Sequence, residues 1–530
     1  MNITELLKRN AITYADEIAI KHIKYIDSNH STNNESVNQN NKVLKQTLTW
    51  KQFNIRANKV ANLLIDLGIK KNDKVAILLP NCLEWLPLYF GILKIGAIAV
   101  PLNYRFDSKE LGHCLSCVNC SVVFTSIDYD ELIRETIKNL QPVPCFVFLE
   151  KTGVIPEYSK SYMELMCLAK ESSPLAEIND EDNAAIYFTS GTTGMPKAIL
   201  LSHKALMAAC DTEKNHHFQV KEDIFLCIPP LYHTGAKMHW FGSLAAGGSM
   251  VLLGNISPRY ILETISNEKI SIVWLLVPWA QDILAAIECG DININHYDFS
   301  NWRLTHMGAQ PISATLIKKW LMVFPMQSYD TNYGLSEAAG PGCVHLGLNN
   351  IHKVGAIGKA GYGWETSIVD ENGKKVKNNV IGELMVKGPG LMVGYYNDIA
   401  ATDKVLKNGW LLTGDMAYED TDNFIYLVGR KKDIIISGGE NISAVQIENY
   451  IYQHHAVKDV AVIGIQNERV GEMVAAVIEL KPNIKCSKLE ILKFCEGLPD
   501  YKRPRKIIFA QIPRNSTGKI EKVKLRQLYS

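Results

Sequence analysis

Between residues 50 and 280, short apolar runs of strand length alternate with stretches whose apolar residues recur at helical spacing. The runs are Lys74–Leu79, Ala97–Pro101, Val122–Thr125, Ala184–Thr189, Ile224–Ile228, Met250–Leu253 and Ile272–Val277. Strands that alternate with helices are typical of largely parallel sheets covered by helices. The pattern therefore predicts an α/β fold, in which two α/β sheet layers form a large N-terminal domain.

The hydrophobic pattern changes twice further along the chain. Residues 354–428 contain short strand-like runs with glycine-rich turns, which predict a small β-rich subdomain. Gly429–Asp433 is a charged junction, and a compact segment follows it. We expect an N-terminal domain over residues 1–429 and a small mobile α+β C-terminal domain over residues 430–530.

A polar segment interrupts the first predicted hairpin. Ile18–Tyr25 and Leu44–Thr49 have the pattern of strands, and residues 27–42 between them are polar and rich in asparagine. Segments of this composition bury too little apolar surface to become ordered. We expect a hairpin with a long disordered tip.

Length and charge narrow the function classes. A chain of 530 residues exceeds one ordinary hydrophobic core, which also indicates two or more domains. The formal net charge of +1 argues against nucleic acid as a partner. Residues 501–530 nevertheless hold nine Lys or Arg and one acid, Glu521. This basic segment is either a solvated surface or a local attraction for phosphate groups.

Three further features bear on location. No run of about 18 uncharged apolar residues occurs, so we expect no integral membrane association. The first residues include an acid and lack an apolar core, so we expect no signal peptide. Twelve cysteines in a chain of this length fit reduced thiols, and we expect a cytoplasmic protein. The sequence leaves open whether the protein forms a homo-oligomer.

One cysteine cluster has the spacing of a metal site. His113, Cys114, Cys117 and Cys120 could ligate zinc or an iron–sulfur cluster. However, no second pair of cysteines lies at ligand spacing, and the segment has the pattern of a helix that leads into a strand. We favour the interpretation that these cysteines are small buried hydrophobic residues.

The most informative segment is residues 187–204, which lie between and within two strand-like runs. Its glycines let backbone N–H groups approach an anion, its hydroxyl groups add donors, and its lysine adds positive charge. These residues are Thr189, Ser190, Gly191, Thr192, Thr193, Gly194 and Lys197. The segment is not a P-loop, because Pro196 stands where that motif needs glycine and Ala198 follows the lysine. We expect this loop to hold a polyphosphate.

The loop resembles the phosphate loop of the adenylate-forming superfamily, which includes acyl-CoA synthetases, luciferases and the adenylation domains of peptide synthetases. Five further segments resemble motifs of this superfamily in the same order: residues 229–235, 308–311, 333–337, 409–415 and 513–521. Together they span nearly the whole chain. The resemblance is to the acyl-CoA synthetase branch, and it implies that the chain uses ATP, Mg²⁺ and coenzyme A with a small carboxylic acid.

The resemblance also implies a nucleotide site. Small residues there let the backbone and a purine ring come close, and a tyrosine stacks near the adenine. The matching residues are Gly308, Ala309 and Gln310 beside the adenine, Asn332, Tyr333 and Gly334 next to them, Ser336 at the α-phosphate, Asp415 at the ribose hydroxyls, and Arg430 at the ribose or phosphate.

Three residues match catalytic positions of the superfamily. Glu337 would ligate Mg²⁺, for which a carboxylate is a natural ligand. Lys519 matches the catalytic lysine, and His233 matches the pocket-loop residue that faces the acyl group. The substrate carboxylate must attack the α-phosphate of ATP although two anions repel, so Lys197, Mg²⁺ and Lys519 would offset this charge. The expected products are an acyl-adenylate and pyrophosphate, after which the CoA thiol displaces AMP.

Residues 434–442 resemble the form of this region found in acyl-CoA synthetases. By that resemblance, Gly438 and Gly439, which follow Ser437, would admit the pantetheine arm of CoA. In the superfamily the C-terminal domain swings about a hinge that matches Lys432. Ile436 stands where some relatives carry lysine, so that contact is not carried over.

The acyl pocket is expected from position alone. Several of its residues are small and leave room for a bulky ring or chain, and a segment with two tryptophans is either an aromatic wall or part of the core. The pocket residues are His233, Gly235, His239, Gly308, Gly334, Ala338 and Ala339, and the aromatic segment holds Trp274, Val277, Pro278 and Trp279. No acid follows His233 where amino-acid-activating domains bind an ammonium group, and Lys237 and His239 favour an uncharged or anionic acid.

Several functions stay open within this picture. The chain resembles bacterial ligases for aromatic, alicyclic or steroidal acids, including bile-acid CoA ligases. The alternative is a ligase for medium- or long-chain fatty acids in lipid metabolism. An acid–acyl-carrier ligase would differ only in its thiol acceptor. A non-catalytic sensor of an acyl-adenylate or nucleotide is disfavoured, because Lys197, Glu337 and Lys519 are all retained.

Overall fold

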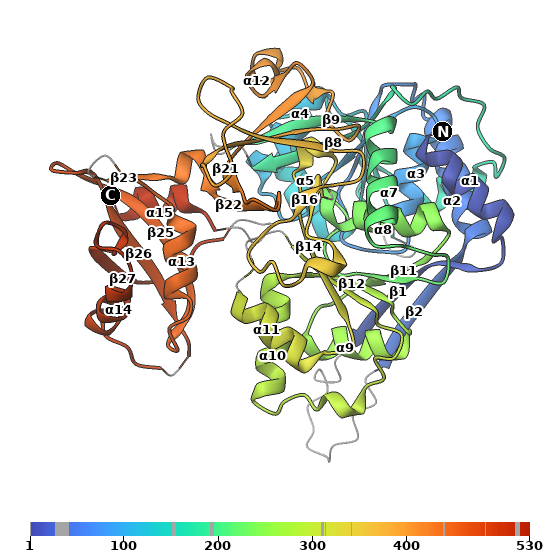
Figure 1. Ribbon diagram of the computed structural model, residues 1–530. Helices are drawn as coiled ribbons and strands as arrows, with labels where there is room; N and C mark the ends of the chain where they lie inside the picture. The colour runs from blue at the N-terminus through green and yellow to red at the C-terminus, as the bar shows by residue number, and fades with distance from the viewer. Residues whose placement is uncertain are drawn as a thin grey trace.

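Two large β-sheets form the centre of the N-terminal part in the computed structural model (Figure 1). The structure describes residues 2–26, 42–150, 155–190, 195–308, 312, 314–340, 342–437, 440–482, 484–514 and 520–529. Within these residues, the first sheet has eight strands, in the spatial order β19 (Gly394–Tyr395), β9 (Pro196–Ser202), β8 (Asn183–Ser190), β4 (Ile98–Pro101), β3 (Lys74–Ile77), β5 (Val122–Thr125), β6 (Cys145–Phe148) and β7 (Ser159–Ser161).

The second sheet has nine strands over the same described ranges. Their order is β16 (Lys359–Ala360), β15 (Val344–His345), β14 (Ser328–Tyr333), β13 (Leu304–Gly308), β12 (Ile272–Leu276), β10 (Ile224–Cys227), β11 (Ser249–Leu253), β1 (Ile18–Ile26) and β2 (Lys42–Thr49). Strands β1 and β2 form the predicted antiparallel hairpin. Its predicted tip lies outside the described residues, apart from Lys42, which pairs with Ile26.

One hydrophobic core joins the inner faces of both sheets. It includes Ile77 of β3 and Leu252 of β11, together with helices that lie between and beside the sheets. These helices are α1 (Ile3–Thr13), α2 (Trp50–Asp66), α3 (Trp85–Leu93), α6 (Tyr162–Leu168), α7 (His203–His216) and α8 (Thr234–Ala246). Helix α8 is buried on nearly every side, which explains why its sequence is apolar without one polar face.

Further helices cover the outer faces. Helices α4 (Ser108–Val118) and α5 (Asp130–Ile137) pack on the eight-stranded sheet. Helices α9 (Pro258–Asn267), α10 (Val277–Glu288) and α11 (Ala314–Val323) pack on the nine-stranded sheet (Figure 1). The N-terminal part is therefore layered as helices, sheet, helices, sheet and helices, which confirms the predicted α/β fold.

The predicted β-rich subdomain is present. It consists of a small antiparallel sheet with one short helix, made of β17 (Glu365–Val369), β18 (Gly382–Lys387), β21 (Trp410–Glu419), β20 (Leu406–Lys407), β22 (Ile425–Arg430) and α12 (Ile399–Val405).

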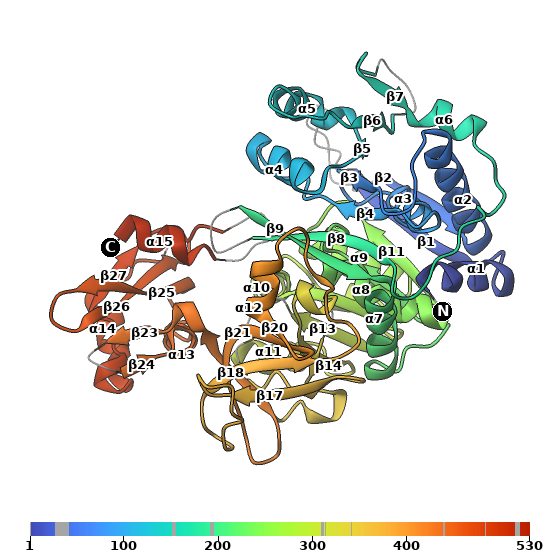
Figure 2. The ribbon, with the colours of Figure 1, turned by 90° about the horizontal axis from the view of Figure 1, so that it is seen from above.

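The C-terminal segment has its own sheet and cores. The elements are β23 (Ile435–Ser437), β24 (Glu440–Ile442), β25 (Val457–Asn467), β26 (Gly471–Leu480) and β27 (Lys506–Phe509), with α13 (Ala444–Ile451), α14 (Lys488–Phe494) and α15 (Lys522–Tyr529). Two apolar clusters lie within this segment. Figures 1 and 2 both place it beside β21. The exact boundary between residues 429 and 430, and the mobility of this domain, stay predictions.

Among the described helices, none combines the length and the apolarity that crossing a membrane requires. The cysteine cluster lies on and just after α4, where Cys114 and Cys120 belong to the core of the first sheet. Burial raises the pKa of Cys120 to about 12, which disfavours the thiolate that a metal needs. This supports the interpretation of these cysteines as packing residues.

We predict that the C-terminal segment can be destabilised without the rest of the chain. Ile463 of β25 is fully buried in one of its two cores. Ile463→Ala should lower the free energy of unfolding of this segment by about 2–5 kcal/mol, because it removes buried methyl groups and leaves a cavity. Thermal unfolding followed by hydrogen exchange of residues after 430 should detect this loss.

The matched control is Ile436→Ala in β23, where the side chain is 56% exposed. All nine tryptophans precede residue 430, so tryptophan fluorescence reports on the N-terminal part alone. An equal fall of the fluorescence midpoint in Ile463→Ala would show one cooperative unit and contradict the predicted division.

Candidate functional site

The predicted phosphate loop joins two strands that end at the same edge. Strands β8 and β9 are antiparallel, with Thr189 opposite Lys197 and Ser190 opposite Pro196. The loop residues Gly191, Thr192, Thr193 and Gly194 lie outside the described residues. The antiparallel pairing places Lys197 directly beside Thr189, at the start of the loop.

Tyr395 connects Lys197 with Glu337. It lies on β19, which pairs with β9, and its ring centroid is 4.9 Å from the Lys197 Nζ. Its hydroxyl donates to Glu337 Oε1 at 3.1 Å. Burial, and next the Glu337 carboxylate, raise the pKa of Tyr395, so the phenol stays a proton donor. A lysine cation and a carboxylate are therefore held at one tyrosine, as a site for phosphates and a divalent cation requires.

Sequence reasoning missed Tyr395. It belongs to a two-residue strand far from the motifs, and only its pairing with β9 brings it to the site. The sequence contains no pattern that would distinguish Tyr395 from the neighbouring Tyr396.

Asp415 is the centre of a second group of predicted residues. It accepts a hydrogen bond from the Tyr333 hydroxyl, and its Oδ1 lies 2.8 Å from the Arg430 Nε. Burial and the Asp415 carboxylate raise the pKa of Tyr333 well above its usual value. Asp415 is 5% exposed, and the Thr413 hydroxyl accepts from its backbone N–H at 3.1 Å. The tyrosine, carboxylate and guanidinium of three separate motifs thus meet at one point.

Two hydroxyl groups join the motif that contains His233 (residues 229–235) to the motif that contains Ser336 (residues 333–337). His233 is the N-cap residue of α8, and the Thr234 hydroxyl next to it lies 3.0 Å from the Ser336 hydroxyl. Ser336 and Glu337 belong to a short 3₁₀ turn after β14. Gly334, between β14 and this turn, is exposed, whereas Ala338 and Ala339 are buried. His233 and Ser336 are therefore held on neighbouring elements.

Trp274 and His239 lie against the small residues of the predicted acyl pocket. The two rings are 4.9 Å apart between centroids. A Cβ built on Gly235 would lie 3.4 Å from Trp274 Cη2, and one built on Gly308 would lie 3.7 Å from Trp274 Nε1. The Asn332 side-chain amide lies 3.3 Å from His239 Nε2. These five residues form one continuous contact, and Trp274 belongs to the hydrophobic core that surrounds it.

Burial lowers the pKa of His239 to about 4 although Glu213 opposes this shift, so its imidazole is neutral at physiological pH. The sequence predicts that Lys237 helps to select an uncharged or anionic acid. In the structure, however, the side chain of Lys237 does not present its charge to the substrate. It is fully buried, its Nζ donates to the Leu231 carbonyl at 3.0 Å and lies 4.2 Å from the Tyr187 ring centroid. Burial lowers its pKa well below the usual value.

The residues predicted for the second half-reaction lie in the C-terminal segment. Lys432 is exposed just after β22, and Ser437 ends β23. Gly438 and Gly439 connect β23 to β24 and lie outside the described residues, as do Lys519, Ala309 and Gln310. The base of the segment that holds Lys519 is described: Arg514 pairs with Ile520 in an isolated bridge, and Glu521 N donates to Pro513 O at 2.9 Å.

Comparisons with known proteins assign the chain to a family. Residues 29–396 match the AMP-binding enzyme family, and residues 446–519 match the AMP-binding enzyme C-terminal domain. A long-chain-fatty-acid–CoA ligase of Mycobacterium tuberculosis is 30% identical, over 91% of this chain and 93% of its own length. The crotonobetaine/carnitine–CoA ligase of Proteus mirabilis is also 30% identical, over 90% of this chain and 93% of its own length.

Two solved structures with bound adenylates are similar over nearly their whole length. An anthranilate CoA ligase in complex with anthranoyl-AMP has a TM-score of 0.87 and 26% identity, covering 100% of this chain and 97% of the other. The o-succinylbenzoate CoA synthetase of Bacillus subtilis, with its acyl-adenylate intermediate, has a TM-score of 0.83 and 25% identity, covering 99% and 98%. The chain therefore belongs to the AMP-binding enzyme family, within the acyl-CoA synthetase branch of the adenylate-forming superfamily, and is an AMP-forming acid–CoA ligase that uses ATP, Mg²⁺ and coenzyme A.

Proposed function

We propose that this ligase activates a bulky cyclic carboxylic acid, of the aryl, alicyclic or steroidal (bile-acid) type. The observation that carries the proposal is the Trp274 indole, which we assign as the aromatic wall of the acyl pocket. It lies against Gly235 and Gly308, and a rigid aromatic ring packs favourably against another ring.

The polar atoms of this wall support the same substrate class. Trp274 Nε1 and His239 Nδ1 are buried and have no hydrogen-bond partner among the described residues. A buried donor without a partner costs about 1–3 kcal/mol. A hydroxyl or oxo group on a ring would satisfy such a donor, whereas an alkyl chain would not. The names of the two adenylate-bound neighbours, anthranilate and o-succinylbenzoate ligases, point to cyclic acids as well.

A ligase for medium- or long-chain fatty acids is the second candidate. It is favoured by the 30% identity to a long-chain-fatty-acid–CoA ligase. A cyclic acid with a hydroxyl or oxo group would accept a hydrogen bond from the buried Trp274 N–H, whereas a fatty acid would not. This difference is the basis of a test.

The residues of the site have distinct roles in this proposal. Lys197, with residues 189–194, binds the phosphates, and Gly308–Gln310 with Asn332–Gly334 flank the adenine. Asp415 and Arg430 hold the ribose, and Ser336 contacts the α-phosphate. The Glu337 carboxylate and its hydrogen-bonded Tyr395 fit a hard divalent cation, so Mg²⁺ would lie here and offset the phosphate charge.

The acyl group is held by the elements around α8. His233 faces the carboxyl end, and Gly235, His239, Gly334 and Ala338 line the ring. Lys519 stabilises the charge that develops when the carboxylate attacks the α-phosphate. Rotation about Lys432 then removes Lys519 and presents Ser437, Gly438 and Gly439 to the pantetheine arm.

The first test is AMP release that depends on ATP and CoA, with short, fatty, aryl and bile acids. We expect thioester formation to be fastest with a hydroxylated or oxo-bearing cyclic acid. Trp274→Phe keeps the ring but removes the N–H, and should lower kcat/KM for that acid about tenfold, the effect of one lost hydrogen bond. Its kcat/KM for a fatty acid should not change.

Fastest turnover with a fatty acid would contradict the cyclic-acid proposal. An equal loss of kcat/KM for both acids in Trp274→Phe would contradict it as well. Binding of ATP without turnover of any acid would favour a sensor. Turnover with a carrier protein but not with free CoA would show that the thiol acceptor is a carrier protein.

Lys519→Ala should separate the two half-reactions. Adenylate formation should fall about 10²–10³-fold or more, because a positive charge on the transition state is lost. Thioester formation from supplied acyl-adenylate and CoA should continue at the wild-type rate. Pyrophosphate exchange measures the first step, and Lys524→Ala on α15 is a control for the loss of basic charge nearby. An equal loss in both steps is incompatible with the assigned role.

Gly439→Leu should have the opposite effect. A bulky side chain would occupy the path that we assign to pantetheine, so the rate of thioester formation should fall at least about tenfold while adenylate accumulates. Ile436→Ala on the adjacent strand removes an exposed side chain and serves as the control. Unimpaired CoA transfer in Gly439→Leu would show that Gly438 and Gly439 do not line the CoA site.

A further inference from the structure

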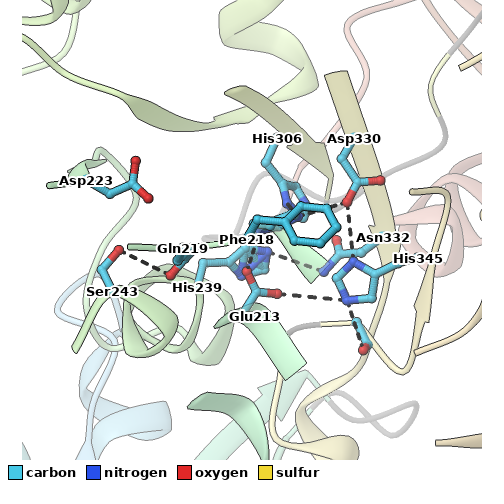
Figure 3. A network of polar contacts seen from close by, with 12 residues as sticks. Glu213, Phe218, Gln219, Asp223, His239, Ser243, His306, Asp330, Asn332 and His345 are labelled. Atoms are coloured by element: carbon cyan, nitrogen blue, oxygen red, sulfur yellow. Dashed lines mark hydrogen bonds and ion pairs between the residues drawn. The ribbon is translucent and has the colours of Figure 1, made fainter. Parts of the chain in front are cut away.

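A fully buried cluster of histidines and carboxylates lies behind the acyl pocket (Figure 3). It is formed by α7 with the residue that follows it, and by β13, β14 and β15. Its members are Glu213, His217, His306, Asp330 and His345, each no more than 2% exposed. The activity derived above uses none of them. Because unpaired charge is expensive in a protein interior, a cluster of this composition needs an explanation.

Three ligand atoms converge at its centre. His217 Nε2 lies 2.8 Å from Asp330 Oδ2, and His345 Nδ1 lies 3.4 Å from the same oxygen. The three atoms all lie within 4.8 Å of one another. Ligands bound to a tetrahedral zinc ion at about 2.0–2.2 Å are separated by about 3.3–3.5 Å. The His345 contact has this spacing, and the shorter His217 contact would widen when an ion binds. His306 Nδ1 lies 3.1 Å from His217 Nε2 and forms a second ligand group with His217 and Glu213.

In His217 and His345, the ring nitrogen that faces away from Asp330, called the outer nitrogen here, has a hydrogen-bonding partner. Metal-bound histidines usually have such a partner. His217 Nδ1 lies 3.0 Å from Glu213 Oε2, so a carboxylate faces the side of the ring remote from Asp330. His345 Nε2 donates to the Gly342 carbonyl at 3.1 Å. A Cβ on Gly342 would lie 2.5 Å from that nitrogen, so the contact requires glycine. Such outer partners fix the tautomer and orient the inner nitrogen toward a metal.

Hydrogen bonds to one oxygen also fix the orientation of the Asp330 carboxylate. Its Oδ1 accepts from the backbone N–H groups of Thr331 at 2.8 Å and Gly347 at 2.9 Å. Its Oδ2 is thereby left to face His217 and His345; Figure 3 shows the contact with His345. The carboxylate is therefore arranged to bind a cation through one oxygen.

A bound cation would complete this arrangement. With the His345 proton on Nε2, its Nδ1 lone pair faces the Asp330 carboxylate, and an ion between these two atoms would be ligated by both. His306 Nε2 has no partner among the described residues. A doubly charged ion with a neutral His217 would balance both carboxylates.

We propose that His217, Asp330 and His345 bind a structural zinc ion, with His306 as the fourth ligand and Glu213 in support of His217. Imidazole and carboxylate ligands suit zinc among the divalent metals. This site is separate from the Mg²⁺ that the ligase uses at Glu337. Its role is to tie β13, β14 and β15 to the end of α7, and two of these strands lead directly to Gly308 and Asn332.

The test measures metals in the full-length enzyme, produced without a polyhistidine tag in zinc-supplemented medium and dialysed against EDTA. We expect about one zinc ion per chain, with nitrogen and oxygen but no sulfur neighbours in zinc X-ray absorption. His345→Gln should lower the zinc content to about a tenth or less. Glu213→Gln should weaken retention against a chelator by about 10–100-fold.

His203→Gln is the matched control, because His203 is a fully buried histidine at the other end of α7. It should retain zinc. Absence of zinc in the wild type, sulfur in the metal shell, or full zinc in His345→Gln would each overturn the proposal. If the variants do not fold, the metal content and absorption spectrum of the wild-type enzyme still decide it. Stoichiometric binding of another metal would overturn the assignment to zinc.

Discussion

The predicted adenylate site depends on one buried carboxylate, Asp415, which accepts the Tyr333 hydroxyl and pairs with the Arg430 guanidinium. Tyr333 belongs to the nine-stranded sheet, whereas Asp415 and Arg430 lie opposite each other on neighbouring strands of the small β-rich sheet. Removing one partner would leave a poorly solvated charge, so the contact holds these parts in register. The same carboxylate is the proposed ribose ligand, which places the nucleotide where the parts of the chain join.

The reaction faces an electrostatic problem, because a carboxylate must approach a polyphosphate. The protein offers no covalent nucleophile in our account, and positions charge instead. Tyr395 holds Glu337 by a hydrogen bond and Lys197 by its ring, so the cation site and the phosphate site keep a fixed separation. In the proposed mechanism, the remaining charge comes from Lys519 on the C-terminal segment. A mobile domain can therefore supply this charge for one step and withdraw it for the next.

The acyl pocket and the buried histidine cluster share the same two strands. His306 and Gly308 are two residues apart on β13, as are Asp330 and Asn332 on β14, so each pair lies on one face of the sheet. His239 contacts Asn332 on the pocket side and His306 on the cluster side. Whatever holds the cluster therefore also sets the positions of the residues that we expect to recognise the acyl group.

The sequence by itself determined the α/β fold, the β1–β2 hairpin and the superfamily, and it predicted the residues of the nucleotide site. These features depend on local signals: apolar runs alternate with helical stretches, and Tyr333–Glu337 and Gly409–Asp415 are contiguous motifs. Only the tertiary structure decided that Tyr395 joins Glu337 to Lys197, that Lys237 is buried among aromatic rings, and that distant histidines converge. His217 and Asp330, for example, are 113 residues apart. Such contacts depend on how strands and helices pack, and no periodic pattern in one segment contains that information.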